Sequence, residues 1–265
     1  MQINIHQDRM LVISDLHLGC SLFTKIHLLE KFFEFAKQNQ FHVCINGDGL
    51  DFSQSTLIQM AQDVPIIFNQ ISQLRDANLK VYYIVGNHDM VLEYFLQDWG
   101  LCEILPFMNL VSKDKRIRIE HGHLYDPLYV KSPDLYQWME KLGGLLLRFT
   151  PTFYHLYKRL ERYIYGNDIL GTSGRLGEKP NFLRTVSELF QRGFDAVIFG
   201  HTHRPGVVKF GHHKIYINLG TWIHRPYFTK IQDGQVELLE FGGISKIFKI
   251  SPELVYQSQL GLVTK

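Results

Sequence analysis

The sequence of 265 residues contains only three cysteines, Cys20, Cys44 and Cys102. Their odd number and unpaired spacing favour reduced thiols in a cytoplasmic protein over a disulfide framework. Residues 1–15 lack the basic and apolar segments of a signal peptide. No apolar run approaches the roughly 18 residues that span a bilayer. We therefore expect a soluble, cytoplasmic protein, and we leave open peripheral contact with the inner membrane.

The chain also lacks a strong excess of charge of either sign, because its formal net charge is only +2. Nucleic-acid-binding domains usually carry a marked basic surface, so we expect no stable nucleic-acid partner. We find neither an internal repeat nor a low-complexity segment. The length, with 45% hydrophobic and 20% charged residues, fits one large globular domain over residues 1–265.

Short apolar segments alternate with segments of helical periodicity along most of the chain. The periodicity predicts helices over 25–38, 56–77 and 180–192. The predicted strands are 9–14, 41–45, 80–85, 116–120, 196–199 and 215–217. This alternation predicts an α/β fold with buried sheets. Residues 227–230 and 236–241 flank Asp233-Gly234, which predicts an antiparallel hairpin closing the sheets.

Residues 125–179 interrupt this alternation. Two helical stretches, 134–148 and 152–165, are separated by Pro151 and followed by a glycine-rich segment. We therefore expect a helical insertion at about 125–179 between two strands of the core.

Polar residues stand at the ends of most predicted strands, where ligands bind in open α/β sheets. Asp15 and His17 are two residues apart, so on extended backbone both side chains leave the same face, and His201 and His203 repeat this spacing. A single histidine is usually structural, so the argument depends on these positions. The donors are carboxylates, imidazoles and one amide, which favours Mn, Fe or Zn over Ca.

Five ordered blocks carry the candidate chemistry. They are Asp15-Leu16-His17, Gly47-Asp48-Gly49-Leu50-Asp51, Gly86-Asn87-His88-Asp89, His121-Gly122-His123 and Gly200-His201-Thr202-His203. Asp-x-His alone arises often by chance, but five blocks in order at strand ends are specific. Together they resemble the calcineurin-like metallophosphoesterase superfamily. That resemblance implies a two-sheet β-sandwich flanked by helices, and it covers residues 15–203.

The resemblance also implies a dinuclear metal centre, most simply of Mn, with Fe and Zn as alternatives. The implied ligands are Asp15, His17 and His203 for the first metal, Asn87, His121 and His201 for the second, and Asp48 between the two. A carboxylate suits the bridging position because its charge offsets the repulsion between two cations. Two such metals can generate hydroxide and clamp the oxygens of a phosphoryl group. Glycines beside the ligands permit close backbone approach.

His88 follows a ligand, and its family counterpart contacts the phosphate and aids the leaving group, as a general acid would. Asp89 is a candidate for orienting His88, with a turn-capping role as the alternative. For Asp51 the alternatives are support of a ligand and a local turn. His123 is a candidate substrate contact rather than a ligand, because the matched motif uses His121.

Within the superfamily, the chain is most similar to the bacterial UDP-2,3-diacylglucosamine diphosphatase group of lipid A biosynthesis. The likeness lies in the insertion after the His-Gly block, in Gly200–Pro205 and in Asn218–Trp222. It implies a small-molecule or lipid-linked nucleotide substrate that is hydrolysed to UMP and a lipid sugar phosphate. The chain departs from the group in two places. One is Asp48–Asp51, and the other is His88, which stands where the group usually has Arg.

Basic residues in and after the insertion are candidate substrate contacts, namely Arg148, Arg159 and Arg204. Aromatic and basic residues together suit an interfacial helix, although an ordinary amphipathic pair would show the same pattern. An alternative is a metal-dependent phosphodiesterase or nuclease of other specificity. A non-catalytic scaffold on the same fold is disfavoured, because the implied ligands and His88 are all present.

Overall fold

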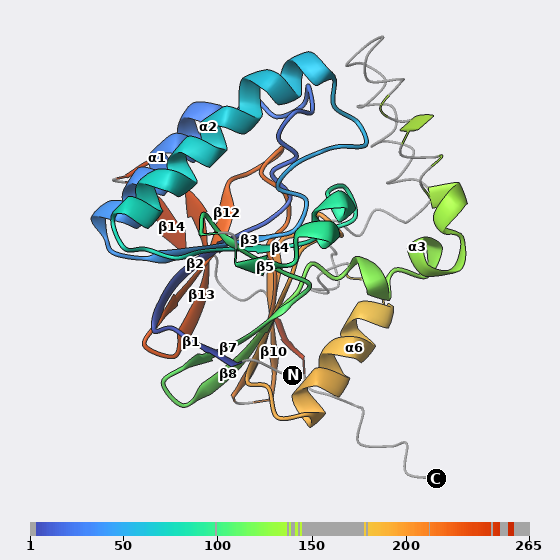
Figure 1. The fold of residues 1–265 in the computed structure, drawn as a ribbon. Helices are drawn as coiled ribbons and strands as arrows, with labels where there is room; N and C mark the ends of the chain where they lie inside the picture. The colour runs from blue at the N-terminus through green and yellow to red at the C-terminus, as the bar shows by residue number, and fades with distance from the viewer. Residues whose placement is uncertain are drawn as a thin grey trace.

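The computed structural model describes residues 4–98, 100–136, 138, 141–142, 144, 178, 180–211, 213–244, 246–249 and 254–256. In these residues, two mixed β-sheets pack face to face and helices cover both outer sides (Figure 1). The expected α/β fold with a two-sheet sandwich is confirmed.

The first sheet has eight strands in the described residues, in the order β14-β13-β12-β2-β3-β4-β6-β5. Strands β2, β3, β4 and β6 run parallel, and β12 pairs antiparallel with β2. The bounds are β2 Arg9–Ile13, β3 His42–Asn46, β4 Val81–Ile84, β5 Gln97–Asp98, β6 Glu103–Leu105, β12 Tyr227–Gln232, β13 Gln235–Phe241 and β14 Ile247–Lys249. The expected hairpin is β12–β13, and β14 lies outside it at the sheet edge.

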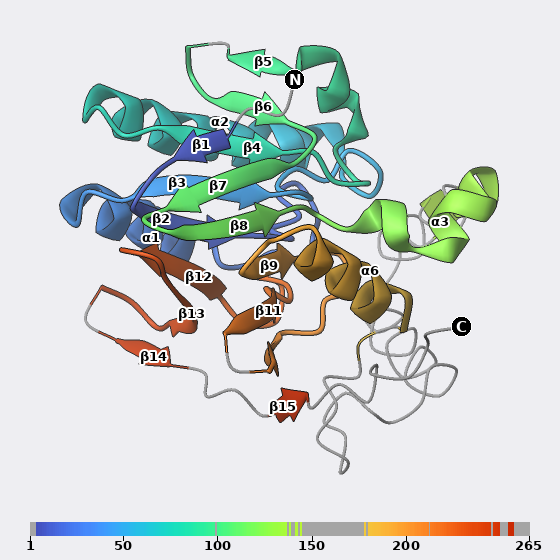
Figure 2. The same ribbon diagram turned by 90° about the horizontal axis from the view of Figure 1, so that it is seen from below.

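The second sheet has seven strands in the described part of the chain, in the order β1-β7-β8-β9-β11-β10-β15. Strands β8, β9 and β11 are parallel. The bounds are β1 Asn4–His6, β7 Met108–Ser112, β8 Lys115–Ile119, β9 Ala196–Phe199, β10 Gly206–Phe210, β11 Lys214–Asn218 and β15 Leu254–Tyr256. Figure 2 shows β7 and β8 lying across β2, β3 and β4 of the other sheet. Sequence periodicity did not predict strands β1, β5, β6, β7, β10, β14 and β15, of which all but β7 and β10 have two or three residues.

Among the described residues, three helices cover the outer faces of the sandwich, and all three were expected. Helices α1 (Ile26–Gln38) and α2 (Leu57–Asp76) lie on the eight-stranded sheet, and α6 (Pro180–Gln191) lies on the seven-stranded sheet (Figure 1). Helix α2 begins at Thr56, which forms a reciprocal capping box with Gln59.

Both faces of the central strands are buried, which explains their continuous apolar sequences. In β2, Leu11 and Ile13 pack beneath α1 and α2, whereas Met10 and Val12 face the other sheet. Phe32 of α1 is fully buried in an aromatic cluster, and truncation to alanine at such a position costs about 3–5 kcal/mol. The rigid sandwich therefore fixes the positions of the strand ends, where the polar residues lie.

The insertion begins with two short helical turns, η2 (His123–Tyr125) and α3 (Pro127–Lys131). Helical backbone follows at residues 133–136, at the start of the first expected stretch, 134–148. The second expected stretch, 152–165, lies outside the described residues. A further short turn, η1 (Met90–Phe95), follows the Gly86–Asp89 block. No helix in the described residues is both long enough and apolar enough to cross a bilayer.

Candidate metal centre

The candidate ligands gather at one end of the sandwich because parallel strands present their carboxyl ends together. Strands β2, β3 and β4 of one sheet lead into Asp15, Asp48 and Asn87. Strands β8 and β9 of the other sheet lead into His121 and His201. The two sheets therefore supply opposite walls of a single cluster.

Most of these ligands have a left-handed backbone rather than the extended backbone that the two-residue spacing suggested. The φ angles of Asp15 and His17 are 53° and 52°, and those of His201 and His203 are 64° and 56°. Our explanation for why each pair converges was therefore wrong, although each pair lies within the cluster. Asp48 also has positive φ. Such strain in residues other than glycine is concentrated at functional sites, where the surrounding structure holds it.

Two of the neighbouring glycines leave room for carboxylates. A Cβ atom on Gly86 would lie 2.2 Å from Oδ1 of Asp48. A Cβ atom on Gly200 would lie 2.5 Å from Oδ2 of Asp15. Both distances are too short for real contacts, so the expected close backbone approach is confirmed at these two positions.

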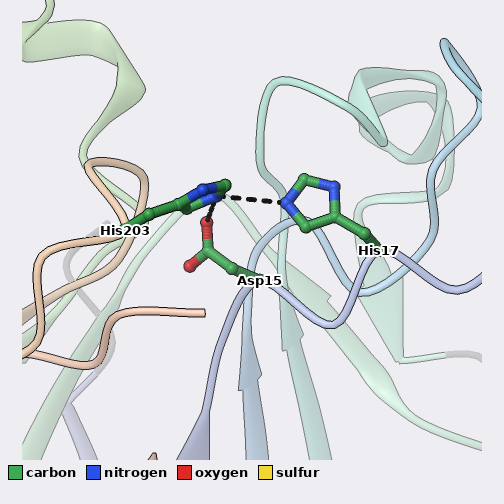
Figure 3. Close-up of side chains that lie close together, drawn as sticks. All are labelled: Asp15, His17 and His203. Atoms are coloured by element: carbon green, nitrogen blue, oxygen red, sulfur yellow. Dashed lines mark hydrogen bonds and ion pairs between the residues drawn. The ribbon is translucent and has the colours of Figure 1, made fainter. Parts of the chain in front are cut away.

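The first group of ligands consists of Asp15, His17 and His203, whose donor atoms lie within 4.8 Å of one another. Nε2 of His203 is 3.0 Å from Oδ1 of Asp15 and 3.2 Å from Nε2 of His17 (Figure 3). Asp51 lies behind this group, with Oδ2 3.2 Å from Nδ1 of His17. A carboxylate only accepts, so the His17 proton is on Nδ1 and the Nε2 lone pair faces the cluster.

The second group consists of Asn87, His121 and His201. Oδ1 of Asn87 is 3.2 Å from Nε2 of His121 and 2.9 Å from Nδ1 of His201. Oδ2 of Asp48 is 3.2 Å from the same His121 nitrogen. Asp48 also shares a donor cluster with His17 and another with Asp15, which fits the expected position between two metals.

The outer nitrogens of the second group are also held by acceptors. Nδ1 of His121 donates to the backbone oxygen of Asn46 at 3.0 Å, and Nε2 of His201 lies 3.1 Å from Oδ2 of Asp126. In the neutral imidazoles, the inner nitrogens therefore direct lone pairs at the Asn87 oxygen. A lone pair that faces an oxygen acceptor needs a proton or a metal cation between the two atoms, and oxygen partners on the outer nitrogen are typical of metal-bound histidine.

The buried carboxylate of Asp15 supports the same conclusion for the first group. Asp15 is fully buried, and its Oδ1 is in ion-pair contact with Nε2 of His203 at 3.0 Å but accepts no hydrogen bond of regular geometry from the described residues. Buried carboxylate oxygens are normally paired, hydrogen-bonded or bound to a metal. The residues present therefore fit divalent cations at both positions, with nitrogen and oxygen donors that suit Mn, Fe or Zn.

The charges within the cluster depend on one another. Burial alone would raise the pKa of Asp48, but the positive charges of His121 and His88 hold it well below its usual range. Burial alone would lower the pKa of His121, but Asp48 and Asp15 raise it to about 9. Without metal, a proton on His121 thus balances the carboxylates, which is the charge that a cation supplies.

The candidate general acid, His88, lies beside the carboxylate of Asp51 rather than that of Asp89. Its Nδ1 is 3.2 Å from Oδ1 of Asp51 and 2.7 Å from Oγ of Ser53. Asp51 also accepts from the backbone of Gln54 at 2.8 Å, so it fills both roles considered for it.

Asp89 is directed at other partners. Its carboxylate accepts from the Gly86 and Gly49 backbone nitrogens at 2.6 and 2.9 Å, and from the Tyr83 hydroxyl at 2.6 Å. Burial raises its pKa to about 6. These contacts are the turn-capping alternative, and they correct the idea that Asp89 orients His88.

The candidate substrate contacts are less defined. His123 is buried among the rings of His121 and Tyr129, at centroid distances of 5.5 and 5.0 Å. Burial lowers its pKa to about 3, so His123 is neutral. Arg204 is half-buried directly after His203. Arg148 and Arg159 lie outside the described residues.

Three supporting residues escaped the sequence analysis. Asp126 caps α3 and contacts His201, although Asp-Pro in the sequence indicated only a helix start. Glu178 is buried, and its Oε2 accepts from Thr202, between the two histidines, at 3.1 Å. Thr221 donates to the backbone oxygen of Asp15 at 3.0 Å. No local pattern reveals these contacts, because each partner is distant in sequence.

This arrangement of paired metal-ligand groups at the ends of two facing sheets defines a metal-dependent hydrolase of phosphate esters. The family model for calcineurin-like phosphoesterases matches residues 9–205, and the chain belongs to that family.

Two curated relatives are both named UDP-2,3-diacylglucosamine hydrolase. The chain is 28% identical over 226 residues to a UDP-2,3-diacylglucosamine hydrolase of Histophilus somni (strain 129Pt), a match that covers 79% of this chain and 90% of the relative. It is 24% identical over 244 residues to a UDP-2,3-diacylglucosamine hydrolase of Shewanella sp. (strain ANA-3). That match covers 87% of this chain and 96% of the relative.

Solved structures with a similar fold are more distant. A dimetal phosphatase from Danio rerio shares 12% identity with a TM-score of 0.48, covering 92% of this chain and 98% of that one. Vps29 from Entamoeba histolytica, complexed with zinc, shares 14% identity with a TM-score of 0.46. The match covers 91% of this chain and 98% of that one.

Proposed function

We propose that this enzyme hydrolyses the diphosphate of UDP-2,3-diacylglucosamine and releases UMP and the acylated sugar phosphate. The observation that carries the proposal is the cluster of two ligand groups joined by Asp48, which suits a substrate with adjacent phosphoryl groups. The names of the relatives support this substrate.

The proposed ligands are Asp15, His17 and His203 at the first metal, Asn87, His121 and His201 at the second, and Asp48 at both. We propose Mn, with Fe or Zn as alternatives. When bound, two such ions polarise the phosphoryl oxygens and lower the pKa of water to near neutrality. Water then adds to one phosphorus while the bridging phosphorus–oxygen bond breaks, and the bridging oxygen leaves with the other phosphate.

His88 is the proposed source of the proton for the leaving oxygen. Asp51 and Ser53 contact its Nδ1, so we assign the proton donated to the substrate to the opposite ring nitrogen. The side chain is only 10% exposed, which limits exchange of that proton with bulk water. General acids positioned in this way contribute typically 10²–10⁴-fold to rate.

The surface around the cluster suits a substrate with acyl chains. Exposed apolar side chains occur on three segments that lead away from the ligand loops: Phe52, Leu57, Ile58, Met90, Val91, Tyr94, Phe95, Leu124, Val130, Leu135 and Trp138. Two of these segments, 90–95 and 124–138, are connected, since Tyr129 donates to the Met90 sulfur at 2.6 Å. Concentrated exposed apolar surface marks binding sites for ligands or membranes. We propose that the reaction takes place in the cytoplasm at the membrane surface, and that Arg204, Arg148, Arg159 and His123 contact the substrate.

The test is hydrolysis of UDP-2,3-diacylglucosamine with Mn²⁺ by wild type, Asp48→Ala and His88→Ala. We expect turnover by wild type, none by Asp48→Ala, and a loss of at least 100-fold in His88→Ala with its metal content unchanged. UDP-N-acetylglucosamine, which lacks the acyl chains, is the matched control and should turn over far more slowly. An enzyme that binds metal and cleaves bis(p-nitrophenyl) phosphate, but leaves the acylated substrate intact, would contradict the assigned substrate while retaining the metal chemistry.

A further inference from the structure

The two ligand groups differ in the supporting contacts of their side chains: His121 of the second group is held by Asn46 in the core, but the other two members are held by the insertion. In the first group, Nδ1 of His17 is held by Asp51, which follows β3 in the core of the fold. In the second group, His201 and Asn87 are held by Asp126 and Tyr136, both from the start of the insertion. The insertion therefore contacts the ligands of one candidate metal and not merely the rim of the site.

Asp126 uses its two oxygens for two separate tasks. Oδ1 accepts from the Leu128 backbone nitrogen at 3.1 Å and caps α3. Oδ2 lies 3.1 Å from Nε2 of His201. Because the carboxylate only accepts, it keeps the His201 proton on Nε2 and leaves Nδ1 with its lone pair toward Asn87, 2.9 Å away.

Tyr136 acts on the other member of the pair. Nδ2 of Asn87 donates to the Tyr136 hydroxyl at 3.2 Å, which leaves the amide oxygen directed at His121 and His201. The Tyr136 ring packs against that of Tyr129 at a centroid distance of 5.3 Å. Without this hydroxyl, the amide of Asn87 loses a contact that distinguishes its oxygen from its nitrogen.

We propose that Asp126 and Tyr136 are positioning residues for the second metal, so that the start of the insertion, residues 125–136, selectively supports metal binding at the Asn87–His121–His201 position. This inference rests on the proposed dinuclear function. Loss of a supporting partner of a metal ligand typically lowers metal affinity 10–100-fold. The first metal should be spared, because its ligands do not depend on these two contacts.

The variant Asp126→Asn tests the tautomer argument without removing the helix cap. Asparagine caps a helix about as well as aspartate, so its oxygen stays with Leu128. The amide nitrogen then faces Nε2 of His201 as a donor, which favours a proton on Nδ1 and blocks the lone pair. The hydroxyl of Tyr136 is removed by Tyr136→Phe, and Tyr129→Phe is its matched control, since that hydroxyl contacts Met90 instead.

The experiment is calorimetric titration of metal-free protein with Mn²⁺, with metal analysis after dialysis and EPR spectra of the Mn²⁺-loaded protein. Wild type should bind two ions and show the spin-coupled spectrum of a dinuclear centre. Asp126→Asn should keep the tight site, weaken the other 10–100-fold and give the spectrum of isolated Mn²⁺. Tyr136→Phe should weaken the same site several-fold, and Tyr129→Phe should match wild type.

Asp51→Asn is the complementary variant, because Asp51 contacts His17. This substitution should weaken metal binding at the first site instead of the second. Two unchanged sites in Asp126→Asn, or equal loss of both, would overturn the proposal. Wild type that binds fewer than two ions would instead refute the dinuclear function on which the proposal rests. Thermal unfolding of each metal-free variant confirms that it folds.

Discussion

Oδ2 of Asp51 lies 3.2 Å from Nδ1 of His17, although the two residues are 34 positions apart in the chain. The other oxygen of Asp51 lies 3.2 Å from Nδ1 of His88. One buried carboxylate thus orients both a candidate metal ligand and the candidate general acid. The opposing effects of burial and the His88 charge leave the pKa of Asp51 below its usual value, so it stays an acceptor for both rings.

Replacing Asp51 with asparagine should therefore impair two functions together. The amide can accept from only one of the two imidazoles, so we expect kcat to fall roughly 10–100-fold or more, with weaker binding of the first metal. Steady-state kinetics at saturating and limiting Mn²⁺ measure the two effects separately. A variant with full activity at every Mn²⁺ concentration would show that neither ring depends on this carboxylate.

Gly86→Ala should disrupt the candidate metal centre. The added Cβ would lie 2.2 Å from Oδ1 and 2.5 Å from the backbone nitrogen of Asp48, so both the carboxylate and the backbone that carries it must move. We expect loss of bound metal and of activity, measured by metal analysis and turnover. Gly211→Ala is the control: Gly211 has φ of 62° and open space around it, so alanine there costs about 1 kcal/mol of stability without affecting metal.

Divalent metal should stabilise the folded protein, because the native ligands converge and those of the unfolded chain do not. At a free Mn²⁺ concentration of 100 times the Kd, the gain is about 2.7 kcal/mol, which corresponds to roughly 5 °C or more in Tm for a chain of this size. Differential scanning calorimetry with Mn²⁺ and with chelator measures the shift. Asp48→Ala should show little of it, and an equal shift in that variant would place the stabilising ion elsewhere.

Glu178→Gln should destabilise the loop that carries His201 and His203. One oxygen of Glu178 accepts from Tyr216 and Asn218 at 2.8 Å each, and from Thr202 at 3.1 Å. An amide cannot accept from all three donors as strongly, and a buried donor left unpaired costs about 1–3 kcal/mol. Urea unfolding measures this loss, and Glu188→Gln, an exposed position on α6, should unfold like wild type.

The alternation of apolar strands and amphipathic helices was enough to predict an α/β fold with buried sheets and its main elements, and the family resemblance implied the two-sheet sandwich. Segments such as 9–14 and 196–199 are apolar on both faces, which only a doubly covered strand requires. The short strands could not be predicted in this way. Strands such as β6 and β14 have three residues each, too few to show a period, and pairing with a neighbouring strand decides their conformation.

By itself the sequence determined the chemistry of the site, because motif order and residue type identify a cluster of carboxylate, imidazole and amide donors at strand ends. Only the tertiary structure decided which partner each donor has. In the structure, Asp51 contacts His88, Asp89 caps a turn, and Asp126 contacts His201. The tertiary structure also replaced the expected extended backbone at Asp15 and His17 with a left-handed one. The physical reason is that hydrogen bonds and packing between strands distant in sequence set these conformations, and local spacing does not encode them.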